Sequence, residues 1–165
     1  MERNKLYAII RVRGSVNCPY DVEHTLKLLH LYKKYHCVVY PSNLPGLEEM
    51  LMKAKEWITW GEIDRDTLID LLRARGKTPG DKRLTDEYVD KRLADLGVAG
   101  GIPALADAVL SGKLALHKLE SVIKPVFRLR PPRGGFKGSV KKSYREGGET
   151  GYRGADIGEL IKRMI

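Results

Sequence analysis

The segment "YAIIRVRG", residues 7–14, sets the fold class because it alternates as a β-strand does. Successive side chains of a strand point to opposite faces of a sheet, so Ala8, Ile10 and Val12 share one face. The other face holds Tyr7, Ile9, Arg11 and Arg13. The pattern predicts a half-buried strand that ends at Gly14, with two arginines at the end of its open face.

Downstream, helix and strand patterns take turns up to residue 63. Pro19 suits the first turn of a helix, and apolar residues at helical spacing give that helix one packing stripe. The stripe consists of Val22, Leu26 and Leu29. "HCVVY" (36–40) predicts a second strand and "TWGEI" (59–63) a third. Between them, a second helix has the stripe Leu47, Leu51, Ala54 and Ile58. Residues 1–63 therefore predict a two-layer α+β core in the order β-α-β-α-β.

The remaining chain divides into a helical segment and a basic extension. Over residues 64–120, Asp64 and Thr85 are candidate N-caps of two helices, and 102–110 is a third, apolar helix. We expect this segment to pack on or beside the core. In the extension, residues 121–165, "KPVFRLRPP" alternates as a strand with an arginine face, and residues 157–165 predict a closing helix.

Charge is concentrated in the last third of the chain. The formal net charge is +9, and residues 113–165 alone carry 13 Lys or Arg against 5 Asp or Glu. A concentrated basic segment is typical of a protein that binds a polyanion, most often nucleic acid. The alternative interpretation is a solvated tail without a partner.

The residue types between 124 and 145 suit RNA. This stretch has eight basic residues and no acidic one. Arginine matches phosphate with two hydrogen bonds, lysine supplies a mobile charge, and glycine lets the backbone approach closely. Aromatic rings can stack on splayed bases. The candidate RNA-binding residues here are Arg128, Arg130, Arg133, Gly134, Gly135, Phe136, Lys137, Lys141, Lys142, Tyr144 and Arg145.

Several other chemistries lack their motifs. His24, His30 and His36 are six residues apart, a spacing that turns neighbouring positions on a helix to different faces, so we predict no metal site. Gly112-Lys113 lacks the rest of a phosphate-loop pattern, and there is no nucleophile motif.

No apolar run is long enough for a membrane helix, and residues 1–14 do not resemble a signal peptide. We expect a cytoplasmic protein without cofactor or small-molecule substrate, and with Cys18 and Cys37 reduced.

Two blocks of this sequence resemble one family. "RVRGSVN", "TLKLLHL" and "WGE" in the first 63 residues, with "LRPPRGGFKGSVKKSYREGGETGYRG" near the end, are similar to the large-subunit ribosomal protein L-thirty family, whose eukaryotic members are called L-seven. The long ending resembles archaeal and eukaryotic members, and the basic N-terminal arm of eukaryotic members has no counterpart here. An archaeal type fits best. The resemblance is weakest over residues 64–120.

The resemblance implies a fold and a function. The fold is a small, mainly antiparallel sheet with two helices on one face, related to the ferredoxin-like fold. The function is structural: binding of large-subunit rRNA next to other ribosomal proteins, without enzymatic activity. By position, the resemblance adds Arg11, Arg13 and Asn17 to the rRNA-binding residues. Two alternatives stay open: a ribosome-assembly factor that binds pre-rRNA, and a scaffold protein with a solvated basic tail. For Arg11 and Arg13, the alternative to RNA contact is that they cover the open sheet face.

Overall fold

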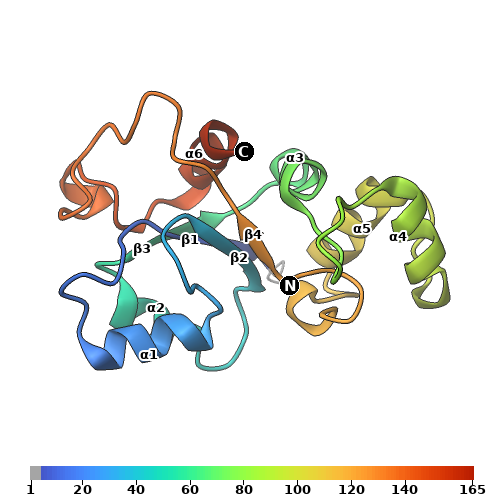
Figure 1. The fold of residues 1–165 in the computed structure, drawn as a ribbon, viewed down its shortest axis with the longest axis horizontal. Helices are drawn as coiled ribbons and strands as arrows, with labels where there is room; N and C mark the ends of the chain where they lie inside the picture. The colour runs from blue at the N-terminus through green and yellow to red at the C-terminus, as the bar shows by residue number, and fades with distance from the viewer. Residues whose placement is uncertain (1–4) are drawn as a thin grey trace.

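The computed structural model describes residues 5–165, so the first four residues of the predicted 1–63 core lie outside it. The predicted β-α-β-α-β start is confirmed (Figure 1). It consists of β1 (Leu6–Arg11), α1 (Tyr20–Leu28), β2 (His36–Pro41), α2 (Leu47–Ala54) and β3 (Ile58–Glu62). The rest of the chain adds α3 (Arg65–Arg75), α4 (Asp86–Leu93), α5 (Gly101–Leu110), β4 (Val126–Arg128), β5 (Gly151–Tyr152) and α6 (Ile157–Met164).

The five strands form one mixed, mostly antiparallel sheet in the order β4-β2-β1-β3-β5. The central strand β1 pairs antiparallel with β2 and with β3, which places Ile9 between Val38 and Trp60. On the outer edges β4 joins β2 antiparallel, and β5 joins β3 parallel. Both edge strands come from residues 121–165, so the basic extension completes the sheet.

Helices cover both faces of the sheet, which corrects the two-layer prediction. On one face, Ile9 packs with side chains of α1 and α2, including Leu26 and Leu51. On the opposite face, Ala8 and Ile10 belong to a cluster with side chains of α3, α4, α5 and α6. Figure 1 shows α1 and α2 on one side of the strands and α3 and α6 on the other. The reason is local: β1 is apolar on both faces, and an apolar sheet face needs a covering layer.

Local signals explain the helix ends. The Asp64 side chain accepts a hydrogen bond of 2.8 Å from the Thr67 N–H, and Thr85 accepts one of 3.2 Å from the Tyr88 N–H, as N-caps do. Both predicted caps are confirmed. One stripe assignment was wrong, because Ile58 begins β3 instead of continuing α2.

The basic extension contributes side chains to the core. Phe127 is fully buried, and Glu149, Thr150 and Arg153 are buried polar residues. The hydrophobic cluster on the sheet face covered by α3, α4, α5 and α6 contains side chains from this extension, from residues 1–63 and from residues 64–120.

In the described residues, no single helix is long and apolar enough to cross a membrane. The helices Asp86–Leu96 and Gly101–Leu110, bent by 47°, reach that length and composition only as a pair.

Candidate nucleic-acid interface

Most of the predicted contact residues lie on the surface. The exposed ones are Asn17, Arg128, Arg130, Arg133, Gly134, Gly135, Lys137, Lys141, Lys142, Tyr144 and Arg145. Arg13 and Phe136 are half-buried, and Arg11 is buried. Figure 1 shows the loop after β1 and the turn before β5 toward the same end of the molecule, away from α4 and α5.

The cations of this surface have no acidic partners. None of the ion pairs between described residues includes any of Arg13, Arg128, Arg130, Arg133, Lys137, Lys141, Lys142 or Arg145. Lys124, by contrast, pairs with Asp81. Side chains with this charge and no internal counter-ion are free to neutralise an external anion. We call these eight residues the free cations.

A glycine turn fixes the backbone next to Arg130 and Arg133. Gly134 and Gly135 both have φ of 74°, a left-handed conformation that glycine adopts readily. The Arg133 N–H donates to the Arg163 carbonyl at 3.0 Å, and the Arg163 guanidinium donates back to the Arg133 carbonyl at 3.0 Å. The same guanidinium also donates to the Gly135 carbonyl. Sequence reasoning missed Arg163, although its place on the predicted closing helix was a usable signal.

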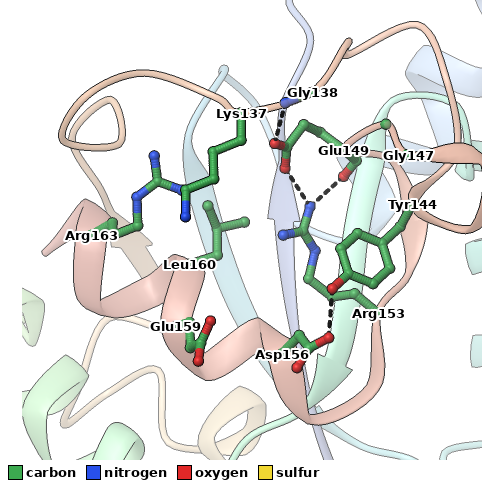
Figure 2. Close-up of a pocket in the computed structure, with 11 residues that line it drawn as sticks. Lys137, Gly138, Tyr144, Gly147, Glu149, Arg153, Asp156, Glu159, Leu160 and Arg163 are labelled. Carbon is green, nitrogen blue, oxygen red and sulfur yellow. Dashed lines mark hydrogen bonds and ion pairs between the residues drawn. The ribbon is translucent and has the colours of Figure 1, made fainter.

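A buried ion pair fixes the second basic turn, around Lys141 and Lys142. The Arg153 guanidinium donates to Glu149 Oε2 at 2.8 Å and to the Glu149 carbonyl at 2.6 Å (Figure 2). It also donates to Thr59 Oγ1 at 2.7 Å. The other carboxylate oxygen, Oε1, accepts from the Gly138 N–H at 2.9 Å. The Lys142 carbonyl accepts from the Glu149 and Thr150 N–H groups. The turn is therefore built on β3 and holds its lysines without RNA.

The two aromatic residues predicted to bind RNA, Phe136 and Tyr144, each contact another side chain with their rings. Phe136 lies 6.2 Å from the ring of Tyr35, centroid to centroid. The Arg153 guanidinium lies 4.7 Å from the centroid of Tyr144, and the Tyr144 hydroxyl donates to Asp156 Oδ2 at 2.5 Å. This hydrogen bond raises the pKa of Tyr144. Stacking of a base on either ring is limited by these contacts.

Arg11 is an internal side chain, which corrects its predicted place on an open face. It is 0% exposed. Its guanidinium donates to the Leu31 carbonyl at 2.8 Å and to Glu23 Oε2 at 3.1 Å. It also donates to the Arg13 carbonyl and to Ser15 Oγ. With its nitrogens occupied and covered, Arg11 positions the loop after β1 and does not face a partner.

Arg13 and Asn17 lie in that loop and keep accessible surface. The Arg13 guanidinium stacks 4.5 Å from the ring centroid of Trp57 and donates a long hydrogen bond of 3.4 Å to the Glu56 carbonyl. Asn17 is exposed and has φ of 59°, the left-handed region that asparagine tolerates better than most residues. Both side chains remain compatible with a contact outside the chain.

At the β4 edge, basic residues crowd a histidine. His36 is the register partner of Arg128, so the two side chains stand on the same sheet face. Burial lowers the pKa of His36, and Arg128 and Lys33 lower it further. The positive charges of Arg128 and Lys33 near His36 repel one another, and an anion bound here would reduce that repulsion. Among the described residues, no group of three or more His, Cys, Asp or Glu is arranged for a metal ion.

Comparison with known proteins identifies a class of ribosomal proteins. The family model described as ribosomal protein L30p/L7e matches residues 7–58, from β1 to the start of β3. This range contains most of the first of the two blocks that carried the resemblance, but it ends before the WGE motif at residues 60–62.

Curated relatives extend the match over nearly the whole chain. "Large ribosomal subunit protein uL30" of Staphylothermus marinus is 65% identical over 97% of this chain and 98% of its own length. The proteins of the same name from Hyperthermus butylicus and Methanococcus vannielii are 61% and 44% identical, over 98% and 96% of this chain and 91% and 99% of their own lengths. The chain therefore belongs to the uL30 family of ribosomal proteins, also described as L30p/L7e.

Proposed function

We propose that this chain binds large-subunit rRNA through its free cations, as a non-enzymatic structural constituent of the archaeal large ribosomal subunit. Family membership supports the structural role. The observation that carries RNA binding is the set of eight accessible cations that lack acidic partners inside the described chain. Other proteins of the large subunit are the second class of partner that this role implies.

The expected affinity is mainly electrostatic. Each phosphate that a cation neutralises releases condensed counter-ions, and this makes binding steeply dependent on salt. If about six of the free cations contact phosphates, the binding constant should fall roughly 10³-fold between 50 and 200 mM salt. Because the glycine turn and the turn around Glu149 are held by internal hydrogen bonds, little ordering is needed on binding.

Filter binding of a large-subunit rRNA transcript at several salt concentrations tests the proposal. The test variant replaces Arg130, Arg133, Lys137, Lys141 and Lys142 by glutamine. We expect weaker binding and a log–log salt slope smaller by up to about 4.5, since each lost phosphate contact removes about 0.9 from the slope. Thermal stability should barely change, because these side chains make no ion pair within the described chain.

A matched control removes the same charge elsewhere. The control variant replaces the exposed residues Lys27, Lys55, Lys82, Lys91 and Arg92 by glutamine. It should keep most of the salt slope, because those residues lie outside the proposed surface. Equal slopes for the two variants would refute the proposed contact surface.

A further inference from the structure

A pocket opens inside the proposed RNA surface, between α6 and the preceding part of the basic extension, residues 137–153 (Figure 2). Its volume is about 260 Å³, below the usual range of about 300–1,000 Å³ for sites that enclose a drug-sized ligand. Lys137 stands at one side, the ring of Tyr144 at the other, and the buried side chain of Leu160 lies between them. The size and the apolar wall suit one flat ring system.

A buried arginine supplies an unused donor to this pocket. The Arg153 side chain is only 6% exposed. Its Nε and Nη2 atoms donate to Thr59 and Glu149, whereas Nη1 makes no hydrogen bond within the described chain. Figure 2 shows this second terminal nitrogen turned away from Glu149, toward the space next to Leu160. A fixed guanidinium with a free N–H₂ group can donate to an acceptor of a ligand that enters the pocket.

The charges that line the pocket are balanced and give a phosphate no net attraction. Glu149, Asp156 and Glu159 line it together with the cations Lys137, Arg153 and Arg163. Glu149 is neutralised by Arg153, and Asp156 accepts from Tyr144, but Glu159 forms no ion pair or hydrogen bond within the described chain. A carboxylate next to a donor repels an anion and accepts hydrogen bonds from a neutral ring with N–H groups.

We propose that this pocket takes one unpaired guanine base of the bound RNA, with Arg153 donating to its O6 and Glu159 accepting from its N1–H and N2–H₂. Lys137, exposed and without an ion pair in the described chain, then lies at the mouth for the nucleotide's phosphate. The inference rests on the proposed RNA-binding function and adds a base-specific contact to it.

The donor and acceptor order selects guanine over the other bases. Adenine and cytosine present an amino group where Arg153 needs an acceptor. Uracil offers an acceptor and an N–H, but its second carbonyl would face the carboxylate of Glu159. Guanine alone has an acceptor next to two neighbouring donors. Base contacts in single-stranded RNA commonly use such edge hydrogen bonds with splayed bases.

NMR titration of the isotopically labelled full chain with GMP, AMP, CMP, UMP and inorganic phosphate tests this contact. We expect GMP to shift the Arg153 side-chain resonance and the amides of Gly138, Gly147 and Gly148, which surround the pocket. The other nucleotides should bind about tenfold or more weakly, as for a well-made base contact. Equal shifts with all four nucleotides, shifts with phosphate alone, or no shifts at these amides would overturn the inference.

Two carboxylate variants distinguish guanine binding in the pocket from general binding to the basic surface. Glu159→Gln should lose the preference for GMP at least tenfold, because an amide cannot accept from both guanine donors. Glu146 is an exposed carboxylate next to Tyr144 that does not line the pocket, so Glu146→Gln should keep the preference for GMP. If the wild-type chain binds rRNA with the expected salt slope but shows no nucleotide preference, only the guanine pocket fails. If it does not bind rRNA at all, the proposed function fails.

Discussion

Arg11 is a buried charge held by a complete set of partners. Its guanidinium lies between β1 and α1, where it binds Glu23 and the Leu31 carbonyl. Burial by itself would raise the pKa of Glu23, but the Arg11 charge and the hydrogen bonds from Cys18, Arg11 and Ser15 outweigh that and lower it. Removing Arg11 takes the charge partner from the part-buried Glu23 carboxylate and the donor from the Leu31 carbonyl, and both losses are costly.

Replacing Arg11 by alanine should therefore destabilise the protein strongly. We expect a loss of about 3–5 kcal/mol in the free energy of unfolding, as for one-sided removal of a buried ion pair. Arg13→Ala is the matched control and should cost about 0.5–1 kcal/mol, the value of an accessible cation–π contact. Urea denaturation of both variants measures the difference, and equal losses would contradict the buried role of Arg11.

His36 and His117 should make the folded protein less stable at acid pH. Burial lowers the pKa of both, from an ordinary value of 6.5. Below that value the unfolded chain binds protons that the folded chain refuses, so the free energy of unfolding should fall as pH drops from about 7.5 to 5. The double variant His36→Asn and His117→Asn should flatten this slope, whereas the exposed His24→Asn should not. Chemical denaturation at several pH values measures the change of the free energy of unfolding with pH. An unchanged slope in the double variant would contradict its assignment to His36 and His117.

At the residue level, the sequence indicated which residue types bind phosphate but could not separate a buried arginine from an exposed one. The sequence pattern puts Arg11 and Arg13 on the same alternating face, although β1 ends at Arg11 and Arg13 lies in the loop that follows. Their different roles depend on Glu23 and Leu31, which are 12 and 20 residues further along. For Arg153 the ion-pair partner Glu149 is only four residues away, but the contact with Thr59 that fixes the guanidinium on β3 spans 94 residues.

Among the elements, β3 and the turn before α6 meet at a contact that only glycine permits. A Cβ built on Gly61 would lie 1.9 Å from the Gly154 carbonyl oxygen. The Arg153 N–H also donates to the Trp60 carbonyl at 2.9 Å. The glycine of the "WGE" motif thus lets the extension approach the sheet edge closely enough to add β5.

Gly61→Ala should therefore weaken the attachment of the extension. We expect a loss of about 1–3 kcal/mol, the usual cost of forcing extra volume into a packed site. Hydrogen exchange should speed up selectively in residues 149–154. Gly14→Ala is the control: its Cβ would meet no atom within 4 Å, and it should be neutral or slightly stabilising. Unchanged exchange in Gly61→Ala would contradict the close contact.

The elements that the sequence predicted well are those with local signals. Periodicity and caps identified α1, α3 and α6 because the responsible residues lie within the element. β5 has two residues and no pattern of its own, and its pairing with β3 spans about 90 residues of sequence. The helical layer on the Ala8 and Ile10 face of β1 was also missed, because the helices that cover it, α3 to α6, come much later in the sequence.

For the whole molecule, charge separates the chain into an internal part and a surface for a partner. The buried arginines have carboxylate partners, whereas the free cations of the extension and the loop after β1 have none within the described chain. Because the turns that carry these cations are held by the fold itself, the basic surface is formed without a partner. We propose that this surface keeps the chain in the mature large subunit.

Sedimentation of large subunits washed with increasing salt tests that claim most directly. The account predicts about one copy of the wild-type chain per mature subunit at low and moderate salt. The variant with glutamine at Arg130, Arg133, Lys137, Lys141 and Lys142 should leave the subunit at lower salt, since its attachment uses fewer phosphates. Finding the chain only in precursor particles would instead support an assembly factor, and release of variant and wild type at the same salt concentration would contradict the role of the basic surface.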